Sequence, residues 1–164
     1  MAKTSFNEFL LAVAPEHRVF VEKLNDKLLK QGCELVIKEV KSGYTATYQL
    51  EKKTVMNWVF RKTGIWARIY GDNAGRYEEV IAALPADMQK KMTASRDCKR
   101  LIDPDACSGT CVKGFVYSLN GETQKKCRND GMLFLLTEET AEYIAGLICA
   151  EAAARKPALQ QLNR

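Results

Sequence analysis

Four cysteines lie close together in the second half of the chain and form its clearest chemical pattern. Cys98, Cys107, Cys111 and Cys127 fall within 30 residues and are separated by eight, three and fifteen residues. The short Cys107–Cys111 spacing lets one loop present two thiolates to a tetrahedral zinc ion, each about 2.3 Å from the metal. Cys98 and Cys127 are expected to complete the site from a helix end and a strand end. The spacing therefore predicts a structural zinc site without an open coordination position, because four thiolates satisfy the ion.

Other interpretations of these cysteines stay open from the sequence. An iron–sulfur cluster also takes four thiolates, the thiols can be free in the core or on the surface, and Cys107 with Cys111 can form a disulfide or redox pair. Residues 96–128 carry seven Lys and Arg against four Asp and Glu, a net charge of +3. Such cations favour the thiolate, which assists metal binding and thiol chemistry equally. The two remaining cysteines, Cys33 and Cys149, are expected to be small buried residues.

The rest of the sequence carries no recognisable catalytic motif. No serine lies in a nucleophile elbow, no glycine-rich phosphate loop follows a strand, and no carboxylate pair stands apart from the scattered acids. The single histidine, His17, falls on the same helical stripe as Val21 and Leu24, so we expect it to pack or cap rather than act as a base. The sequence gives no support for an enzyme.

An aromatic β-hairpin is the second candidate site. Residues 54–61 and 65–70 alternate as strands, and a three-residue loop ending in Gly64 would pair Arg61 with Ile65. In that register one face carries five aromatic and basic side chains: Trp58, Phe60, Trp66, Arg68 and Tyr70. Such a face is suited to stacking a nucleobase, with Arg68 contacting a phosphate. The alternative is that a helix covers this face and the aromatic side chains belong to the core.

The elements that must position these residues follow from two hydrophobic periods. Helical spacing predicts helices over 5–11, 15–32, 72–84, 85–95 and 137–155. Two-residue alternation predicts an antiparallel four-stranded meander over 34–41, 44–51, 54–61 and 65–70. Strand-like residues follow at 115–119 and 132–136, with an Asn120–Gly121 turn leading into 122–128. The expected fold class is α+β: a meander with flanking helices, then an irregular cysteine-bearing segment, a short β-hairpin and a C-terminal helix.

Length and composition indicate one domain in a reducing compartment. The chain has 164 residues, of which 46% are hydrophobic and 27% charged, as is typical of globular proteins. We expect residues 1–155 to form one domain, with 96–136 as its cysteine-rich segment and 156–164 as a flexible tail. No signal-peptide core and no apolar stretch of membrane-spanning length is present, which favours a cytoplasmic protein. The net charge of +5 permits an anionic partner without requiring one.

Two stretches resemble bacterial families. The run Trp58-Val59-Phe60-Arg61-Lys62, leading into residues 65–70 after a helix and an earlier hairpin, resembles YdhG-like bacterial domains of unknown function. Cys98-Lys99-Arg100-Leu101 through Cys127-Arg128 resembles the signature of a small uncharacterised bacterial family with an appended cysteine-rich segment. These resemblances imply a compact bacterial α+β fold and carry over no activity and no catalytic residue.

Three functional hypotheses follow. The first is a cytoplasmic binding or adaptor domain whose cysteines hold a structural metal. The second is a thiol-based redox protein or sensor that uses the same segment. The third is a weak nucleic-acid-binding module that uses the aromatic hairpin, since the positive charge is spread over loops rather than concentrated in one basic helix. A protein or small-molecule partner is compatible with all three, and no membrane partner is expected.

Overall fold

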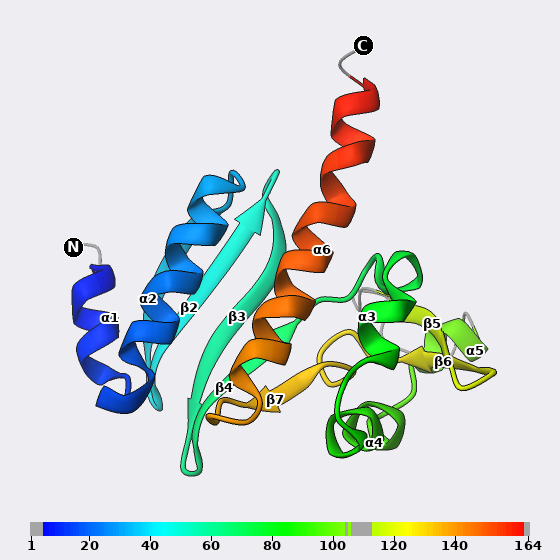
Figure 1. The fold of residues 1–164 in the computed structure, drawn as a ribbon, viewed down its shortest axis with the longest axis horizontal. Helices are drawn as coiled ribbons and strands as arrows, with labels where there is room; N and C mark the ends of the chain where they lie inside the picture. The colour runs from blue at the N-terminus through cyan, green and yellow to red at the C-terminus, as the bar shows by residue number, and fades with distance from the viewer. Residues whose placement is uncertain (1–4, 104, 106–112, 163–164) are drawn as a thin grey trace.

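A five-stranded antiparallel sheet forms the body of the protein (Figure 1). The computed structural model describes residues 5–103, 105 and 113–162, with side chains as far as residue 155. The sheet order is β1-β2-β3-β4-β7, and its strands are β1 (Glu34–Val40), β2 (Gly43–Leu50), β3 (Lys53–Arg61), β4 (Gly64–Ile69) and β7 (Leu133–Leu135). The predicted α+β class and meander are confirmed. A fifth strand, β7, extends the meander by pairing with β4. These two strands are separated by 63 residues of chain, so the local sequence pattern could not predict their pairing.

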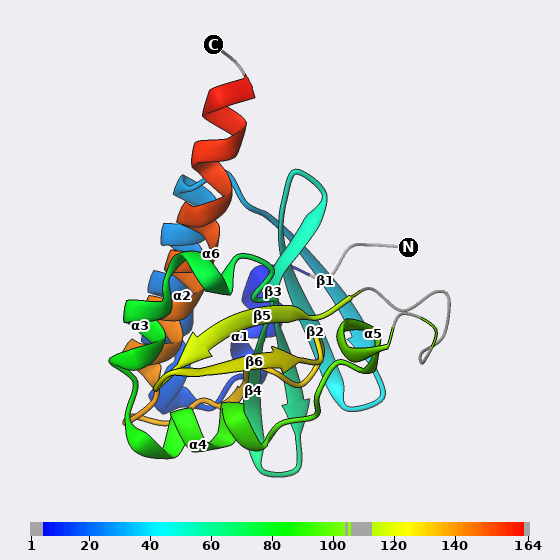
Figure 2. The ribbon, with the colours of Figure 1, turned by 90° about the vertical axis from the view of Figure 1, so that its right-hand side faces the viewer.

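Three helices cover one face of this sheet: α1 (Phe6–Ala12), α2 (Pro15–Lys30) and α6 (Ala141–Leu162) (Figures 1 and 2). Ser5 caps α1 in a reciprocal capping box with Glu8. The apolar stripe of α2 that includes Val21, Leu24 and Leu28 is buried in the core. Beneath these helices the sheet contributes Tyr48 and Trp58, both fully buried. One part of the core therefore lies between this face of the sheet and the three helices, and the core continues into the segment after β4 with Ile81, Met88 and Phe115.

A smaller unit of short helices and a hairpin packs at the β4–β7 end of the sheet (Figure 2). It contains η1 (Ala74–Arg76), α3 (Glu78–Ala82), α4 (Ala86–Ala94), α5 (Lys99–Ile102) and the hairpin of β5 (Phe115–Leu119) with β6 (Glu122–Lys126). The predicted Asn120–Gly121 turn is confirmed, with both residues at positive φ (53° and 81°). One long helix over 72–84 was expected, but the structure divides this stretch into η1 and α3. At the other end of the chain, α6 continues past Arg155 to Leu162, into the stretch expected to be a tail.

The predicted register of the β3–β4 hairpin is wrong by one residue. Arg61 pairs with Gly64, not with Ile65, so the loop has two residues, Lys62 and Thr63. Gly64, at a φ of 136°, serves as the first residue of β4 rather than as the last residue of the loop. Because side chains alternate between the faces of a sheet, this slip moves every side chain of one strand to the opposite face.

Among the described residues, no helix combines the length and the apolar character that crossing a bilayer requires.

Candidate functional site

The cysteine-bearing segment is held to the hairpin by a single β-bridge. Asp97, between α4 and α5, pairs antiparallel with Lys126 at the end of β6. Backbone hydrogen bonds on either side complete this contact: the Cys98 N–H donates to the Lys125 carbonyl at 2.9 Å, and the Cys127 N–H donates to the Arg96 carbonyl at 2.8 Å. Two predicted ligands distant in sequence, Cys98 and Cys127, therefore flank the same bridge.

A buried lysine anchors this bridge from one side. The Lys126 side chain is 4% exposed, and its ammonium donates to the carbonyl oxygens of Thr93 and Ser95 and to the Asp97 carboxylate at 2.7, 3.1 and 2.8 Å. A buried ammonium is tolerated only when its donors are satisfied in this way. The Lys126 contacts thus join the end of α4 to β6 and fix the backbone from which both cysteines project.

The cysteines project from the other side of the bridge. Successive residues of an antiparallel ladder point to opposite faces, so Cys98 and Cys127 both lie opposite the Asp97–Lys126 ion pair. Cys98 is opposite Lys125 in the ladder, which makes Cys127 its diagonal neighbour, with Cα atoms about 7–8 Å apart in such pairs. Both side chains are therefore expected on the same side of the bridge.

Backbone N–H groups surround the sulfur of Cys98. The Gly114 N–H donates to Cys98 Sγ at 3.3 Å. Burial raises the pKa of this thiol. Hydrogen bonds from the backbone N–H groups of Gly114, Leu101 and Arg100 lower it, as does the positive charge of Arg100. The lowering effects are larger together, so the pKa of Cys98 lies below its usual value. The side chain is nevertheless buried, since Cys98 is only 6% exposed. This environment stabilises a thiolate, which is the form that binds metals.

Gly114 makes this arrangement possible by having no side chain. A Cβ at this position would overlap the backbone oxygen of Lys126 and lie 3.0 Å from the Cβ of Cys98. Only glycine therefore allows the backbone N–H to approach the sulfur. Gly114 follows Cys111 by three residues in the sequence.

The other two predicted ligands, Cys107 and Cys111, lie outside the described residues, as do all of residues 106–112. Within the described ranges, no cluster of three or more His, Cys, Asp or Glu side chains is placed to hold a metal ion. Cys98, Cys127 and Cys149 are free thiols. Cys33 is buried as expected, whereas Cys149 is only half-buried, and burial raises the pKa of its thiol.

The aromatic hairpin does not form the single face that the sequence predicted. Trp58 and Phe60 lie on the covered face: Trp58 is fully buried, and the Phe60 ring packs 5.8 Å from that of Phe9 in α1. The corrected register places Trp66 and Arg68 on the opposite face. Tyr70, just beyond β4, is 8% exposed and accepts a hydrogen bond from Asn57. The five residues are therefore divided between two faces and cannot act as one stacking platform.

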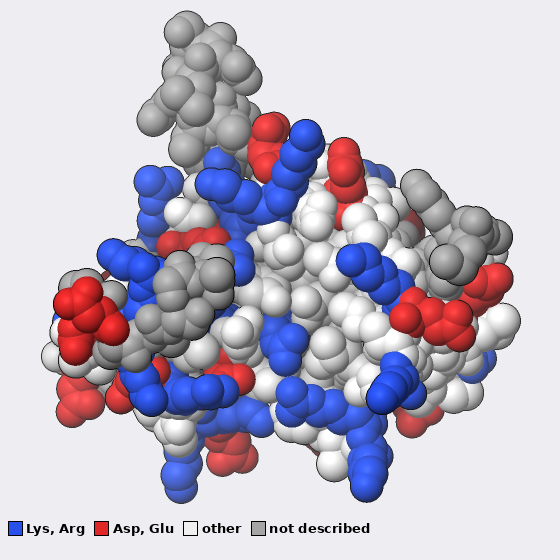
Figure 3. All heavy atoms as spheres, turned by 180° about the vertical axis from the view of Figure 1, so that it is seen from behind, with Lys and Arg blue, Asp and Glu red and all other residues white. Residues whose placement is uncertain are grey.

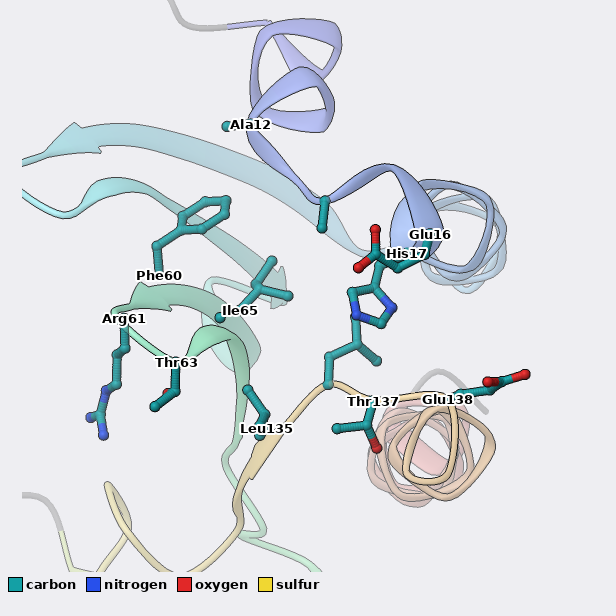
Figure 4. A pocket seen from close by; sticks show the side chains of 13 residues that line it. Ala12, Glu16, His17, Phe60, Arg61, Thr63, Ile65, Leu135, Thr137 and Glu138 are labelled. Atoms are coloured by element: carbon teal, nitrogen blue, oxygen red, sulfur yellow. The ribbon is translucent and has the colours of Figure 1, made fainter.

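His17 lines an open cavity of about 520 Å³ at the end of the β3–β4 hairpin (Figure 4). The cavity lies between the start of α2, the hairpin residues Arg61 to Ile65 and the chain that leads into α6. Glu16 and His17, from the start of α2, line the cavity together with Thr137, from the chain before α6 (Figure 4). Among the described lining residues there is no cysteine, serine or lysine that His17 could activate as a nucleophile.

A buried polar cluster that the sequence analysis missed joins α6 to the segment after β4. Glu151, fully buried, accepts hydrogen bonds from the Asn73 N–H and amide (3.0 and 2.8 Å), the Tyr77 hydroxyl (2.7 Å) and Arg155 Nε (2.8 Å). Arg155 also donates to the carbonyl oxygens of Lys53 and Tyr70. Burial, followed by the Glu151 charge, raises the pKa of Tyr77 far above its usual value. These groups satisfy one another, so the cluster is a structural contact rather than a vacant ligand site. The only sequence signal for it is the Glu151–Arg155 spacing of one helical turn.

Comparisons of this chain with protein-family models, with curated proteins and with solved structures found no match. Any assignment of function must therefore rest on the geometry of the molecule itself.

Proposed function

We propose that this chain is a binding domain whose cysteine-bearing segment is held together by a structural zinc ion. Cys98 and Cys127 act as two of the ligands, and Cys107 and Cys111, which lie outside the described residues, supply the other two. The observation that carries the proposal is the environment of Cys98 Sγ, a sulfur that accepts a backbone N–H from Gly114 and has its pKa lowered. Metal ligands commonly receive such outer hydrogen bonds, which orient them and stabilise their negative charge.

The placement of Cys127 supports the same proposal. Two thiolates bound to one tetrahedral ion at about 2.3 Å lie roughly 3.8 Å apart. Diagonal neighbours on an antiparallel ladder bring their side chains within that reach. The surroundings are otherwise poor in stabilising structure, since α5 has only four residues. A metal ion would therefore add the cross-link that this segment lacks.

A thiol-based redox protein is the alternative that uses the same residues. A reactive cysteine needs both a lowered pKa and access to its oxidant. Cys98 meets the first condition but is only 6% exposed. Burial of this kind favours a structural ligand over a sensor.

Metal analysis with a thiol count tests the proposal. We expect the protein purified from cells without added metal to carry one zinc per chain. Cys98→Ser should abolish the zinc content, whereas Cys149→Ser, the matched change of a half-buried cysteine in α6, should leave it intact. Metal-free native protein with all thiols reduced would contradict the proposal. Loss of two free thiols to a disulfide in metal-free protein would favour the redox alternative instead.

The proposed zinc site also bears on the cellular compartment and the molecular role of the protein. Thiolate ligands persist in a reducing compartment, so we place the protein in the cytoplasm. The proposed role is that of an adaptor or ligand-binding domain rather than an enzyme. Bacterial origin and the relationship to YdhG-like domains are further proposals, which rest on the sequence resemblance alone.

A further inference from the structure

The face of the main sheet that lies opposite the three helices is open over β1, β2 and the end of β3, whereas Asn57 of β3 and Leu133 of β7 on the same side are buried. Strand register assigns Val36 and Lys38 of β1, Thr45 and Thr47 of β2, and Val59 of β3 to this face, and none of them is buried. Seen from behind, the middle of the molecule is an expanse of uncharged atoms with Lys and Arg side chains within and below it (Figure 3). We call this surface the open face.

Four cations lie on or beside the open face. Lys38, Arg61 and Arg68 belong to β1, β3 and β4, on the same side of the sheet as Val59. The fourth, Lys91 of α4, lies with its Nζ 4.1 Å from the ring centroid of Trp66, which also belongs to this face. Arg61 lies over the same ring, with its Cζ 5.6 Å from the centroid. Two cations therefore lie within 6 Å of the centroid of the Trp66 ring.

These cations are not neutralised by the protein. None of the four forms an ion pair with a carboxylate in the part of the chain that the structure describes. Within the described ranges, the Arg68 side chain donates to the backbone oxygen of Asn129 and to no carboxylate. Burial, and then repulsion by Arg61, lowers the pKa of Lys91. An anion placed between Arg61 and Lys91 would relieve this repulsion.

The breadth of the charge distribution indicates the kind of anion. Lys38 on β1 and Arg68 on β4 are separated by three strand spacings, roughly 14 Å. A single small anion cannot contact both, whereas an extended polyanion can. Threonine hydroxyls lie between the cations, on Thr45 and Thr47, and can form hydrogen bonds with the bases of such a polymer.

We propose that the open face binds single-stranded nucleic acid, with phosphates contacted by Lys38, Arg61, Arg68 and Lys91. Arg61 and Lys91 hold one phosphate beside Trp66, and the strand crosses the sheet toward β1. This surface differs from the aromatic platform suggested by the sequence, because Trp58 and Phe60 are not part of it. It is also independent of the cysteine site, so either proposal can fail without the other.

A single-stranded nucleic acid fits this surface better than two other polyanions. An anionic membrane is bound most firmly where large apolar side chains insert, but the apolar residues of the open face are mainly valines, and Val36 is only 37% exposed. A peptide of Asp and Glu has no aromatic rings to place against the Thr and Val surface between the cations. Nucleobases offer both flat faces and hydrogen-bonding edges.

The salt dependence of oligonucleotide binding provides a quantitative test. Each phosphate contact to a single strand contributes about 0.7 to the slope of log K against log salt, so four contacts predict a slope of about −2.8. Affinity for a labelled mixed-sequence 12-mer, measured by fluorescence anisotropy, should therefore fall about 50-fold between 50 and 200 mM salt. In the Arg61→Ala/Lys91→Ala double variant the slope should decrease to about −1.4, and the fall to about 7-fold.

A matched double variant controls for net charge. Lys23→Ala/Lys30→Ala removes two exposed lysines from α2, on the helical side of the molecule, and should leave the slope unchanged. Thermal melts of both variants verify that each is folded. Equal effects of the two double variants would overturn the proposal, as would tighter binding to duplex DNA, to polyglutamate or to anionic vesicles than to the single strand.

Discussion

Replacing Glu151 tests whether the buried polar cluster holds α6 to the rest of the protein. The carboxylate of Glu151 is fully buried and accepts four hydrogen bonds, one of them from Arg155, whose side chain is only 10% exposed. Glu151→Ala leaves the Arg155 charge without its closest acidic partner and removes the acceptor for the Tyr77 hydroxyl. Removing one partner of a buried ion pair costs about 3–5 kcal/mol.

That loss is a large part of the stability of a typical domain, which is about 5–15 kcal/mol. With a urea dependence of about 2 kcal/mol per M, the unfolding midpoint measured by circular dichroism should fall by about 2 M. Glu142→Ala provides the control, because Glu142 is an exposed residue of the same helix and surface changes stay within about 0.5 kcal/mol.

A double-mutant cycle identifies the source of the loss. If the Arg155 charge, left with only the more distant Asp72 carboxylate at 3.5 Å, carries much of the cost, Glu151→Ala/Arg155→Ala should cost at least about 1 kcal/mol less than the sum of the single variants. A Glu151→Ala variant no less stable than Glu142→Ala would refute the reasoning. Strictly additive single effects would show instead that the two side chains act independently.

Three further changes test the core and the backbone around the cysteines. Burial raises the pKa of Tyr117 to about 12. Since the unfolded chain loses this proton near pH 10, the free energy of unfolding should decline between pH 10 and 12. In urea titrations, Tyr117→Phe should remove the part of this decline that Tyr117 causes. Gly114→Ala should lower the free energy of unfolding by about 1–3 kcal/mol or more, because the added Cβ would overlap the Lys126 backbone. Gly146→Ala in α6 is the control: no atom lies near its added Cβ, so it should raise the free energy of unfolding by about 0.5–1 kcal/mol in the same assay. Trp58→Ala should cost about 3–5 kcal/mol in denaturant unfolding, and a smaller loss would contradict its assignment to the core.

Hydrophobic periodicity predicted the local elements of this fold well. The four strands of the meander, the β5–β6 hairpin and the helices α1, α2 and α4 all lie within a few residues of their predicted bounds. Each of these elements is specified by side chains near one another in sequence, or by turn residues such as Asn120 and Gly121. The stripe with Val21, Leu24 and Leu28 likewise predicted the buried face of α2 correctly.

The division of the hairpin residues between faces required the tertiary structure. Both faces of β3 are buried in its middle, where Val55, Met56, Asn57 and Trp58 are all buried, so alternation alone could not select the register. A two-residue loop rather than a three-residue loop decided which of Trp58 and Trp66 belongs to the core.

The fold class, the meander and the four cysteines that are candidates for metal binding could all be predicted before the structure, because each depends on local spacing. Only the tertiary structure placed Cys98 and Cys127 on either side of one bridge, and Glu151 against Asn73, a residue 78 positions away. Nor does the sequence show that Lys91 of α4 and Arg61 of β3 share the ring of Trp66. Contacts between distant segments depend on how the elements pack as a whole, and the periodicity of a single element contains no information about its partner.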